Sequence, residues 1–226
     1  DNSIVLTARS GRAALKNRLS VLGVTLDQDK LDKVYEEFLK LADRKKDIHD
    51  DDILVLAGSI PNTLPEDIYE KILASLESKG IRVVVDATKD LLLNVLKYHP
   101  FLIKPNNHEL GEMFGTVCKT DEDIVHYAKK LQEKGAVNVL ISMAGDGAIL
   151  ITEDGQNIKM GTPKGKVVNS VGAGDSMVAG FITGYIRGGN YEEALKSGTA
   201  AGSATAFSEG LASLEMYEKM LKQITE

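Results

Sequence analysis

The chain has little of several residue types. Its 226 residues include one cysteine, Cys118, no tryptophan and only 5% aromatic residues. One cysteine forms no internal disulfide, so we expect a reducing compartment, the cytoplasm. No apolar run approaches the roughly 20 residues of a membrane-spanning helix, so we expect no membrane partner. The formal net charge of −6 argues against nucleic acid as the main partner.

Several well-known motifs are also missing. The chain has no G-x-x-x-x-G-K-[ST], which excludes a P-loop NTPase. The spacing G-x-G-x-x-G fails because Leu150 and Met177 stand where its last glycine would be. A dinucleotide-dependent oxidoreductase is therefore a distant alternative. Neither a G-x-S-x-G elbow nor an H-E-x-x-H zinc motif occurs.

Short apolar runs alternate with amphipathic stretches of helical period. The runs, typical of strands buried on both faces, cover 52–58, 81–87, 101–106 and 137–143. Runs at 147–152 and 156–160 predict a hairpin around the Asp154–Gly155 turn. Helices are expected over 31–45, 65–80, 89–99, 121–136, 174–189, 191–210 and 214–226. This alternation predicts an α/β fold, with a mostly parallel central sheet and helices on both faces.

Ligands of such folds bind beyond the carboxyl ends of the strands. Four turns of this chain qualify: Gly58–Ser59, Lys104–Asn106, Ser142–Gly147 and Gly172–Asp175. The last belongs to "NSVGAGDSMVAGF", where a helix is expected to begin. Free N–H groups at a helix start attract anions, and Asp175 beside them could take a proton from an attacking hydroxyl. The alternative is an ordinary first-turn acid worth about 1 kcal/mol.

The second and third turns add to this chemistry. Lys104 supplies a cation, and Asn106 and Glu109 supply oxygen ligands suited to hydrated Mg²⁺. The alternative there is a strand end followed by an Asn helix cap. The glycine-rich turn 142–147 would let a nucleotide approach the backbone, or it is simply a hairpin turn. The small residues of "GTAAGSATAF" indicate tight helix packing, which can also leave a slot for a flat base.

Four stretches together resemble one family. "NSVGAGDSMVAGF", "LIKPNNHEL", "LAGSIP" and "ISMAGDGA" are similar to signatures of the ribokinase/PfkB sugar kinases, and they occur in that family's order. The fuller strings look most like its 1-phosphofructokinase branch. The resemblance implies a ribokinase-like fold with a small β lid. It also implies ATP-dependent phosphorylation of fructose 1-phosphate at the 6-hydroxyl, with Mg²⁺ and with a monovalent cation as a further candidate. Tagatose 6-phosphate, fructose 6-phosphate and ribose are alternative acceptors.

Carried over by motif, the resemblance implies a role for each matching residue. Asp175 would be the general base and would contact the acceptor. The anion hole would comprise Gly172, Ala173 and Gly174. Asn106 and Glu109 would bind the metal, and Ser59 would contact the sugar phosphate. The nucleotide would contact Lys104, Asn106, Ser142, Met143, Ala144, Gly145, Asp146, Gly147, Ala201, Gly202 and Thr205.

The front of the chain departs from the family pattern. Residues 1–25 are unmatched, a candidate remnant of the sugar-binding front, and 26–226 form the expected kinase domain. The first strand, its G-G-K-G turn and the lid are not recognisable, so we expect them to be truncated, disordered or diverged. A homodimer is expected if the lid is present. A non-catalytic nucleotide-binding remnant that lacks the acceptor site is the alternative from another functional class.

Overall fold

The structure is a computed structural model. It describes residues 53–58, 60, 65, 67–76 and 81–225, which belong to two compact units. One unit comprises residues 1–54 and 59–83, and the other comprises 55–58 and 84–226. In the first unit, helix α3 (Ile68–Leu76) forms within the predicted range 65–80. The helix predicted over 31–45 and the boundary predicted at residue 25 lie outside the described residues.

Six strands form one sheet in the order β1-β2-β3-β4-β5-β6. They are β1 (Ile53–Ala57), β2 (Arg82–Asp86), β3 (Leu102–Ile103), β4 (Asn138–Ser142), β5 (Ala148–Ile151) and β6 (Asn157–Met160). The pairs β2–β3 and β3–β4 are parallel, whereas β4–β5 and β5–β6 are antiparallel. The sheet is therefore mixed, and its antiparallel arm contains the hairpin predicted around Asp154–Gly155.

The parallel strands are buried on both faces, as their unbroken apolar runs predict. Val84 and Val85 of β2, Leu102 and Ile103 of β3, and Leu140 of β4 have no exposed surface. Burying a side chain of this size contributes roughly 1.5–3 kcal/mol, so these strands anchor the edge at which the candidate residues stand.

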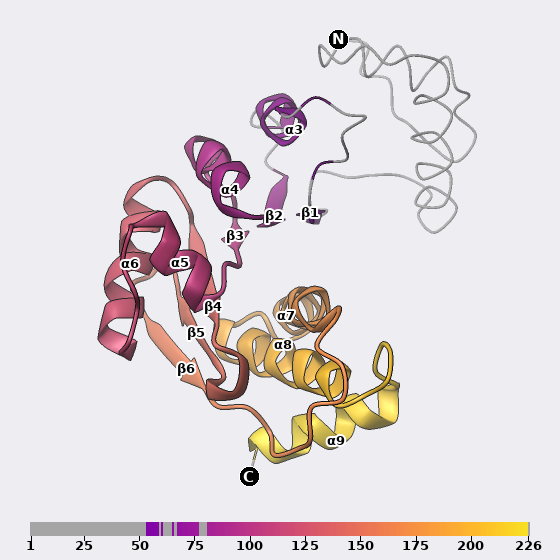
Figure 1. The fold of residues 1–226 in the computed structure, drawn as a ribbon. Helices are drawn as coiled ribbons and strands as arrows, with labels where there is room; N and C mark the ends of the chain where they lie inside the picture. The colour runs from indigo at the N-terminus through magenta and orange to yellow at the C-terminus, as the bar shows by residue number, and fades with distance from the viewer. Residues whose placement is uncertain (1–52, 59, 61–64, 66, 77–80, 226) are drawn as a thin grey trace, which may run out of the picture. The chain divides into compact units, whose positions relative to one another are not determined.

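Helices cover both faces of the sheet in the second unit. They are α4 (Lys89–Val95), the short 3-10 helix η2 (Leu96–Tyr98), α5 (Asn107–Met113), α6 (Asp121–Glu133), the 3-10 turn η3 (Ala144–Asp146), α7 (Ala173–Gly188), α8 (Tyr191–Ala206) and α9 (Leu214–Thr225). Helix α6 lies on one side of strands β4–β6 and α8 on the other (Figure 1). The α/β prediction is confirmed. Among the described residues, no helix has the length and apolar character needed to cross a bilayer.

Helices α7 and α8 pack through small residues. A Cβ added at Gly180 of α7 would lie 2.6 Å from both the Ala201 Cβ and the Ser197 carbonyl oxygen of α8. One added at Gly202 of α8 would lie 3.1 Å from the Ala173 carbonyl oxygen. The small residues of "GTAAGSATAF" therefore pack the helices tightly, which the sequence offered as one interpretation. This seam fixes α8 against the first turn of α7.

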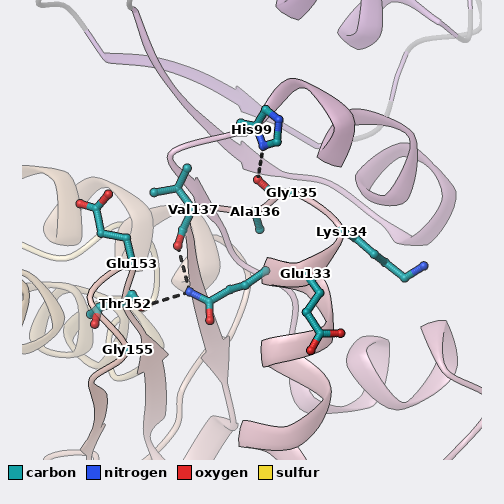
Figure 2. Close-up of a pocket in the computed structure, with 10 residues that line it drawn as sticks. His99, Glu133, Lys134, Gly135, Ala136, Val137, Thr152, Glu153 and Gly155 are labelled. Carbon is teal, nitrogen blue, oxygen red and sulfur yellow. Dashed lines mark hydrogen bonds between the residues drawn. The ribbon is translucent and has the colours of Figure 1, made fainter.

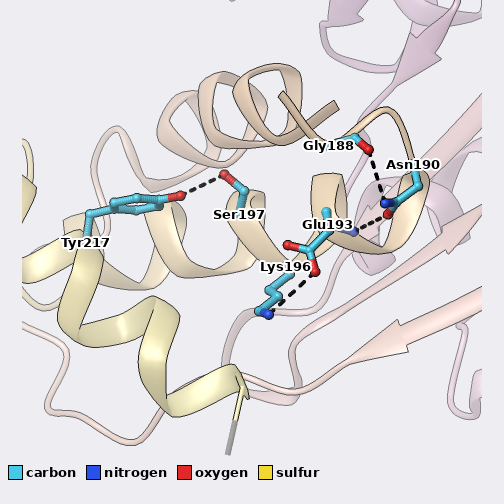
Figure 3. Close-up of polar contacts among 6 residues, drawn as sticks. All are labelled: Gly188, Asn190, Glu193, Lys196, Ser197 and Tyr217. Atoms are coloured by element: carbon cyan, nitrogen blue, oxygen red, sulfur yellow. Dashed lines mark hydrogen bonds and ion pairs between the residues drawn. The ribbon is translucent and has the colours of Figure 1, made fainter. Parts of the chain in front are cut away.

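Polar contacts hold α8 at its start and along its outer side (Figure 3). The Asn190 side chain caps the helix by accepting the Glu193 amide at 2.8 Å, and Lys196 pairs with Glu193 at 3.6 Å. The Ser197 and Tyr217 hydroxyls lie 2.9 Å apart and link α8 to α9. Helix α8 is thus held on one side by α7 and on the other by α9.

Candidate active site

The carboxyl ends of the three parallel strands lie at one edge of the sheet. Asp86 is the last residue of β2, Lys104 follows β3 directly, and Ser142 ends β4. The Gly58 amide, at the turn after β1, donates to the Asp86 carbonyl at 2.9 Å and brings that turn to the same edge. Ser59, predicted to contact the sugar phosphate, lies outside the described residues.

Lys104 and Asp86 form an ion pair in which the Lys104 Nζ lies 3.1 Å from the Asp86 Oδ2. Their side chains are 8% and 18% exposed. A Cβ added at Gly174 would lie 3.2 Å from the Lys104 Nζ, so the ammonium lies against the first turn of α7. Glycine permits this approach because it carries no side chain. Lys104 therefore places its charge where an anion bound to that turn would meet it.

The electrostatics of the edge are dominated by carboxylates. Burial raises the pKa of Asp86 above its usual 3.8, and the Lys104 charge opposes this effect. The negative charges of Asp175 and Glu109 raise the pKa of Asp86 further. Asp86 therefore interacts with one lysine and with two further carboxylates, an arrangement of negative charge that favours a bound cation.

The first turn of α7 leaves backbone donors free. Gly172 precedes the helix with φ 79°, a left-handed conformation that suits glycine. The Ala173 amide donates to the Ser170 carbonyl at 3.2 Å and the Ser176 amide to the Gly172 carbonyl at 2.9 Å. In the described part of the chain, the Gly174 amide has no acceptor.

The neighbouring Asp175 amide likewise finds no acceptor among the described residues, and the Asp175 side chain is exposed. Two amides at a helix N-terminus, with the helix dipole behind them, can bind an anion. The free amides are those of Gly174 and Asp175, whereas the predicted anion hole comprised Gly172, Ala173 and Gly174. The Asp175 carboxylate stands beside these donors and could take a proton from a nearby hydroxyl.

Asn106 and Glu109 form a capping box at the start of α5. The Glu109 amide donates to the Asn106 Oδ1 at 2.8 Å, and the Asn106 amide donates to the Glu109 Oε2 at 2.9 Å. The helix-cap interpretation is therefore confirmed for Asn106. The second Glu109 oxygen has no hydrogen-bond partner among the described residues, so it could bind Mg²⁺, which is often held by one carboxylate and several waters. Among the described residues, no three His, Cys, Asp or Glu side chains converge as a metal site.

The glycine-rich turn joins β4 to β5 through η3. The Met143 amide donates to the Gly147 carbonyl at 2.8 Å, and Ala144 adopts φ 48°. Thr162 donates its hydroxyl to the Gly145 carbonyl at 2.7 Å and braces the turn from outside. Ala144, Gly145 and Asp146 are exposed, whereas the Met143 side chain is buried in the core. The exposed backbone of this turn is what a nucleotide would meet.

Three of the predicted nucleotide contacts lie on α8 and face α7. They are Ala201, Gly202 and Thr205. Ala201 and Gly202 belong to the tight helix seam. Thr205 is 1% exposed, and its hydroxyl bonds to Ser176 and to the Ala212 amide. The structure thus gives these residues packing and hydrogen-bonding roles, and their contact with a nucleotide stays a prediction.

Asp86 is the residue of this edge that sequence reasoning did not select. It ends "IRVVVDA", a predicted buried strand, so its position at a carboxyl end was the available signal. Its pairing with Lys104 depends on the parallel alignment of β2 with β3, which brings together residues far apart in sequence.

A pocket of about 470 Å³ lies at the opposite edge of the sheet (Figure 2). Its lining includes His99, Gly135, Val137 and Thr152, which precede β3 and β4 or follow β5. Gln132 donates to the Val137 and Thr152 carbonyls at 3.0 and 3.1 Å, and His99 Nδ1 bonds to the Gly135 carbonyl. This pocket is thus separate from the edge that carries the candidate residues.

Comparisons with known proteins show which proteins this chain resembles. A 1-phosphofructokinase from Bacillus subtilis (strain 168) is 48% identical over 189 residues, covering 84% of this chain and 62% of that protein. A D-tagatose-1-phosphate kinase from Bacillus licheniformis is 38% identical over 172 residues, covering 76% and 56%. The chain thus spans about three fifths of the length of these relatives.

A crystal structure of phosphofructokinase-2 from Escherichia coli, in complex with substrates and products, superposes with a TM-score of 0.75. It is 28% identical, and the match covers 89% of this chain and 64% of that one.

Two further matches concern parts of the chain. A stretch of 58 residues, 26% of the chain, is 81% identical to 12% of a 2-isopropylmalate synthase from Parabacteroides distasonis. Residues 25–216 match the family model described as pfkB family carbohydrate kinase. This range includes every candidate residue at the carboxyl edge of the sheet. Together with the relatives above, this match shows that the chain belongs to the pfkB family of carbohydrate kinases.

Proposed function

We propose that the chain transfers the γ-phosphoryl group of ATP to the 6-hydroxyl of fructose 1-phosphate, giving fructose 1,6-bisphosphate and ADP. The observation that carries the proposal is the first turn of α7. There the Gly174 and Asp175 amides have no acceptor among the described residues, the Lys104 ammonium lies against Gly174, and the Asp175 carboxylate is exposed. The name of the 1-phosphofructokinase relative supports this acceptor.

In the proposed reaction each group has one task. The Gly174 and Asp175 amides and Lys104 stabilise the charge on the oxygens of the transferring group. Asp175 accepts the proton of the acceptor hydroxyl as that oxygen forms its bond to phosphorus. The bond between phosphorus and the ADP oxygen breaks, and the electron pair leaves with ADP.

The residues at the start of α5 fit a magnesium ion. The free Glu109 oxygen would hold it, with the Asn106 side chain beside it. When bound, Mg²⁺ would neutralise part of the triphosphate charge. Two observations support a cation here. The second Glu109 oxygen has no hydrogen-bond partner among the described residues, and the Asp175 and Glu109 charges act on the buried Asp86 carboxylate.

The acceptor is tested by measuring ADP release with MgATP and, in turn, fructose 1-phosphate, tagatose 1-phosphate, tagatose 6-phosphate, fructose 6-phosphate and ribose. We expect the highest kcat/KM with fructose 1-phosphate and no ADP release without Mg²⁺. A higher kcat/KM with tagatose 1-phosphate would assign the chain the acceptor named for its Bacillus licheniformis relative. No transfer to any acceptor would contradict the proposal.

A non-catalytic nucleotide-binding module is the second candidate. The observation that favours it is that, of the candidate residues in the described part of the chain, Asp175 alone was predicted to contact the acceptor, whereas Ser59 lies outside the described residues. Titration calorimetry with MgATP and with fructose 1-phosphate separates the two functions. A kinase binds both, whereas the second candidate binds only the nucleotide. A homodimer through the family's β lid stays a prediction, which sedimentation of the intact chain would test.

A further inference from the structure

Thr205 places a hydroxyl in a buried position between three segments. The side chain, on the last turn of α8, is 1% exposed. Its Oγ1 donates to the Ser176 Oγ at 2.8 Å and accepts the Ala212 amide at 3.4 Å. A hydroxyl has one proton to donate, and Thr205 donates it to Ser176.

The two partners of Thr205 belong to segments near the proposed chemistry. Ser176 follows Asp175 in the first turn of α7. Ala212 lies in the connection between α8 and α9, where the exposed Leu211 comes within 3.5 Å of a Cβ added at Gly172. One side chain therefore links the turn that carries Asp175 to the connection that lies against Gly172.

We propose that Thr205 is a positioning residue that sets the first turn of α7, and with it the Asp175 carboxylate, through Ser176. The inference rests on the proposed function and assigns Thr205 a task within it. Thr205 acts through Ser176 and touches no substrate. This differs from the nucleotide contact that the family resemblance implies for the same residue.

Packing alone does not replace this link. The seam sets the distance between α7 and α8 through close backbone approaches, such as Gly202 against the Ala173 carbonyl. Those contacts are non-directional, whereas the hydrogen bond to Ser176 fixes how the first turn is rotated. Valine at position 205 has nearly the shape of threonine but carries a methyl group in place of the hydroxyl, so it loses the bond to Ser176 and the acceptor for the Ala212 amide.

Helix α8 offers a matched control at Thr199. This threonine has no exposed surface, and its Oγ1 has no hydrogen-bond partner among the described residues. Thr199→Val is therefore the same change in the same helix without the loss of a bond. It should leave kcat and the affinity for ATP unchanged.

The experiment compares Thr205→Val, Thr205→Ser, Ser176→Ala and Thr199→Val in the intact chain. The readouts are kcat, KM for the acceptor, the calorimetric Kd for MgATP and hydrogen exchange of the Ser176 amide. We expect Thr205→Val and Ser176→Ala each to lower kcat about 10- to 100-fold, with the Kd for MgATP changed by less than about twofold. Thr205→Ser should keep most of the activity. A double variant that combines Thr205→Val with Ser176→Ala should lose no more activity than either single variant.

Several results would overturn the proposal. An unchanged kcat in Thr205→Val would do so, as would an equal loss of kcat in Thr199→Val. A weakened Kd for MgATP with an unchanged kcat would make Thr205 a nucleotide contact. If Thr205→Val does not fold, Ser176→Ala decides, and a normal kcat in that variant rejects the inference.

The readouts also separate this inference from the proposed function. If the unaltered chain transfers phosphate to no acceptor, the function fails. Hydrogen exchange still tests the link, because the Ser176 amide bonds to the Gly172 carbonyl within the turn that Thr205 is proposed to set. Faster exchange in Thr205→Val, but not in Thr199→Val, would support the link without activity. Equal exchange in both would reject it.

Discussion

The polar groups at the two edges of the sheet differ in whether they have protein partners. At the edge where the parallel strands begin, Asn138 is fully buried and donates to the Phe101 carbonyl at 2.9 Å and to the Tyr191 hydroxyl at 3.2 Å. Tyr191 in turn donates to Glu153 at 2.6 Å, and burial, with this bond, raises the pKa of Tyr191. Every one of these groups has a protein partner.

At the edge where those strands end, polar groups are left for a ligand. The Gly174 and Asp175 amides have no acceptor among the described residues, and Asp86 interacts with one lysine and two further carboxylates. Satisfied polar networks stabilise a fold, whereas unsatisfied donors at a helix start bind anions. Among the described residues, donors without acceptors and interacting charges therefore distinguish the candidate active site from the edge where the parallel strands begin.

Removing the Lys104 charge should have the largest effect on this comparison. Lys104→Met takes away a cation that stabilises transferring charge, so we expect kcat/KM to fall about 10²- to 10³-fold. The measurement is steady-state ADP release. Lys134→Met, at the opposite edge, is the control and should keep normal kinetics.

A folding control accompanies Lys104→Met because the substitution leaves Asp86 buried without its partner. The double variant Lys104→Met with Asp86→Asn removes both charges and should unfold at nearly the urea concentration of the unaltered chain. Normal turnover in either folded variant would mean that Lys104 does not serve transfer.

Removing one hydroxyl from the edge where the parallel strands begin should lower stability and leave activity unchanged. Tyr191→Phe loses the bonds to Glu153 and Asn138, so we expect the free energy of unfolding to fall by about 1–3 kcal/mol. Urea titration measures this loss. Tyr98→Phe is the matched control, since the Tyr98 hydroxyl makes no hydrogen bond with the described residues. A lowered kcat in Tyr191→Phe would mean that the edge where the parallel strands begin also contributes to activity.

The capping boxes of α5 and α6 allow a matched test of the proposed Mg²⁺ ligand. Glu109 of α5 and Asp123 of α6 make the same backbone contacts at the third position of their helices. Only Glu109 lies at the carboxyl edge. Glu109→Gln should raise the Mg²⁺ concentration at half-maximal rate about tenfold, as expected when a ligating carboxylate is lost. Asp123→Asn should leave that concentration unchanged, and equal shifts would reject Glu109 as a ligand.

The smallest expected effect is the pH dependence contributed by Asp86. Because its pKa is raised in the folded chain, the folded state holds this proton more tightly than the unfolded chain. The stabilising contribution is full below pH 3.8 and is lost as pH rises through the raised pKa. The free energy of unfolding, relative to Asp86→Asn, should therefore fall as pH rises from about 4 and then level off. An increase with pH would mean that pairing with Lys104 outweighs burial.

Much of this arrangement could be predicted from the sequence. The apolar run 137–143 predicts β4 within a residue at each end, and the acids and Lys-Gly around 121–136 predict α6. The placement of Lys104 and Ser142 at one edge follows from the general rule for parallel strands.

Contacts between distant segments could not be predicted in the same way. The pairing of Asp86 with Lys104 depends on sheet alignment, and the link from Thr205 to Ser176 depends on how α8 packs against α7. Local geometry also decides which amides have an acceptor. The Ala173 amide donates to the Ser170 carbonyl within the turn, whereas the Gly174 amide has no acceptor among the described residues. Sequence patterns place residues along an element, and packing decides which of them meet.

The central claim is that Asp175 acts as the base beside the anion site of α7. Its most direct test is the pair of kcat and the Kd for MgATP in Asp175→Asn, with fructose 1-phosphate as acceptor. If Asp175 is the base, kcat should fall about 10²- to 10⁴-fold while the Kd for MgATP changes little. A folded Asp175→Asn variant that keeps near-normal kcat would contradict it.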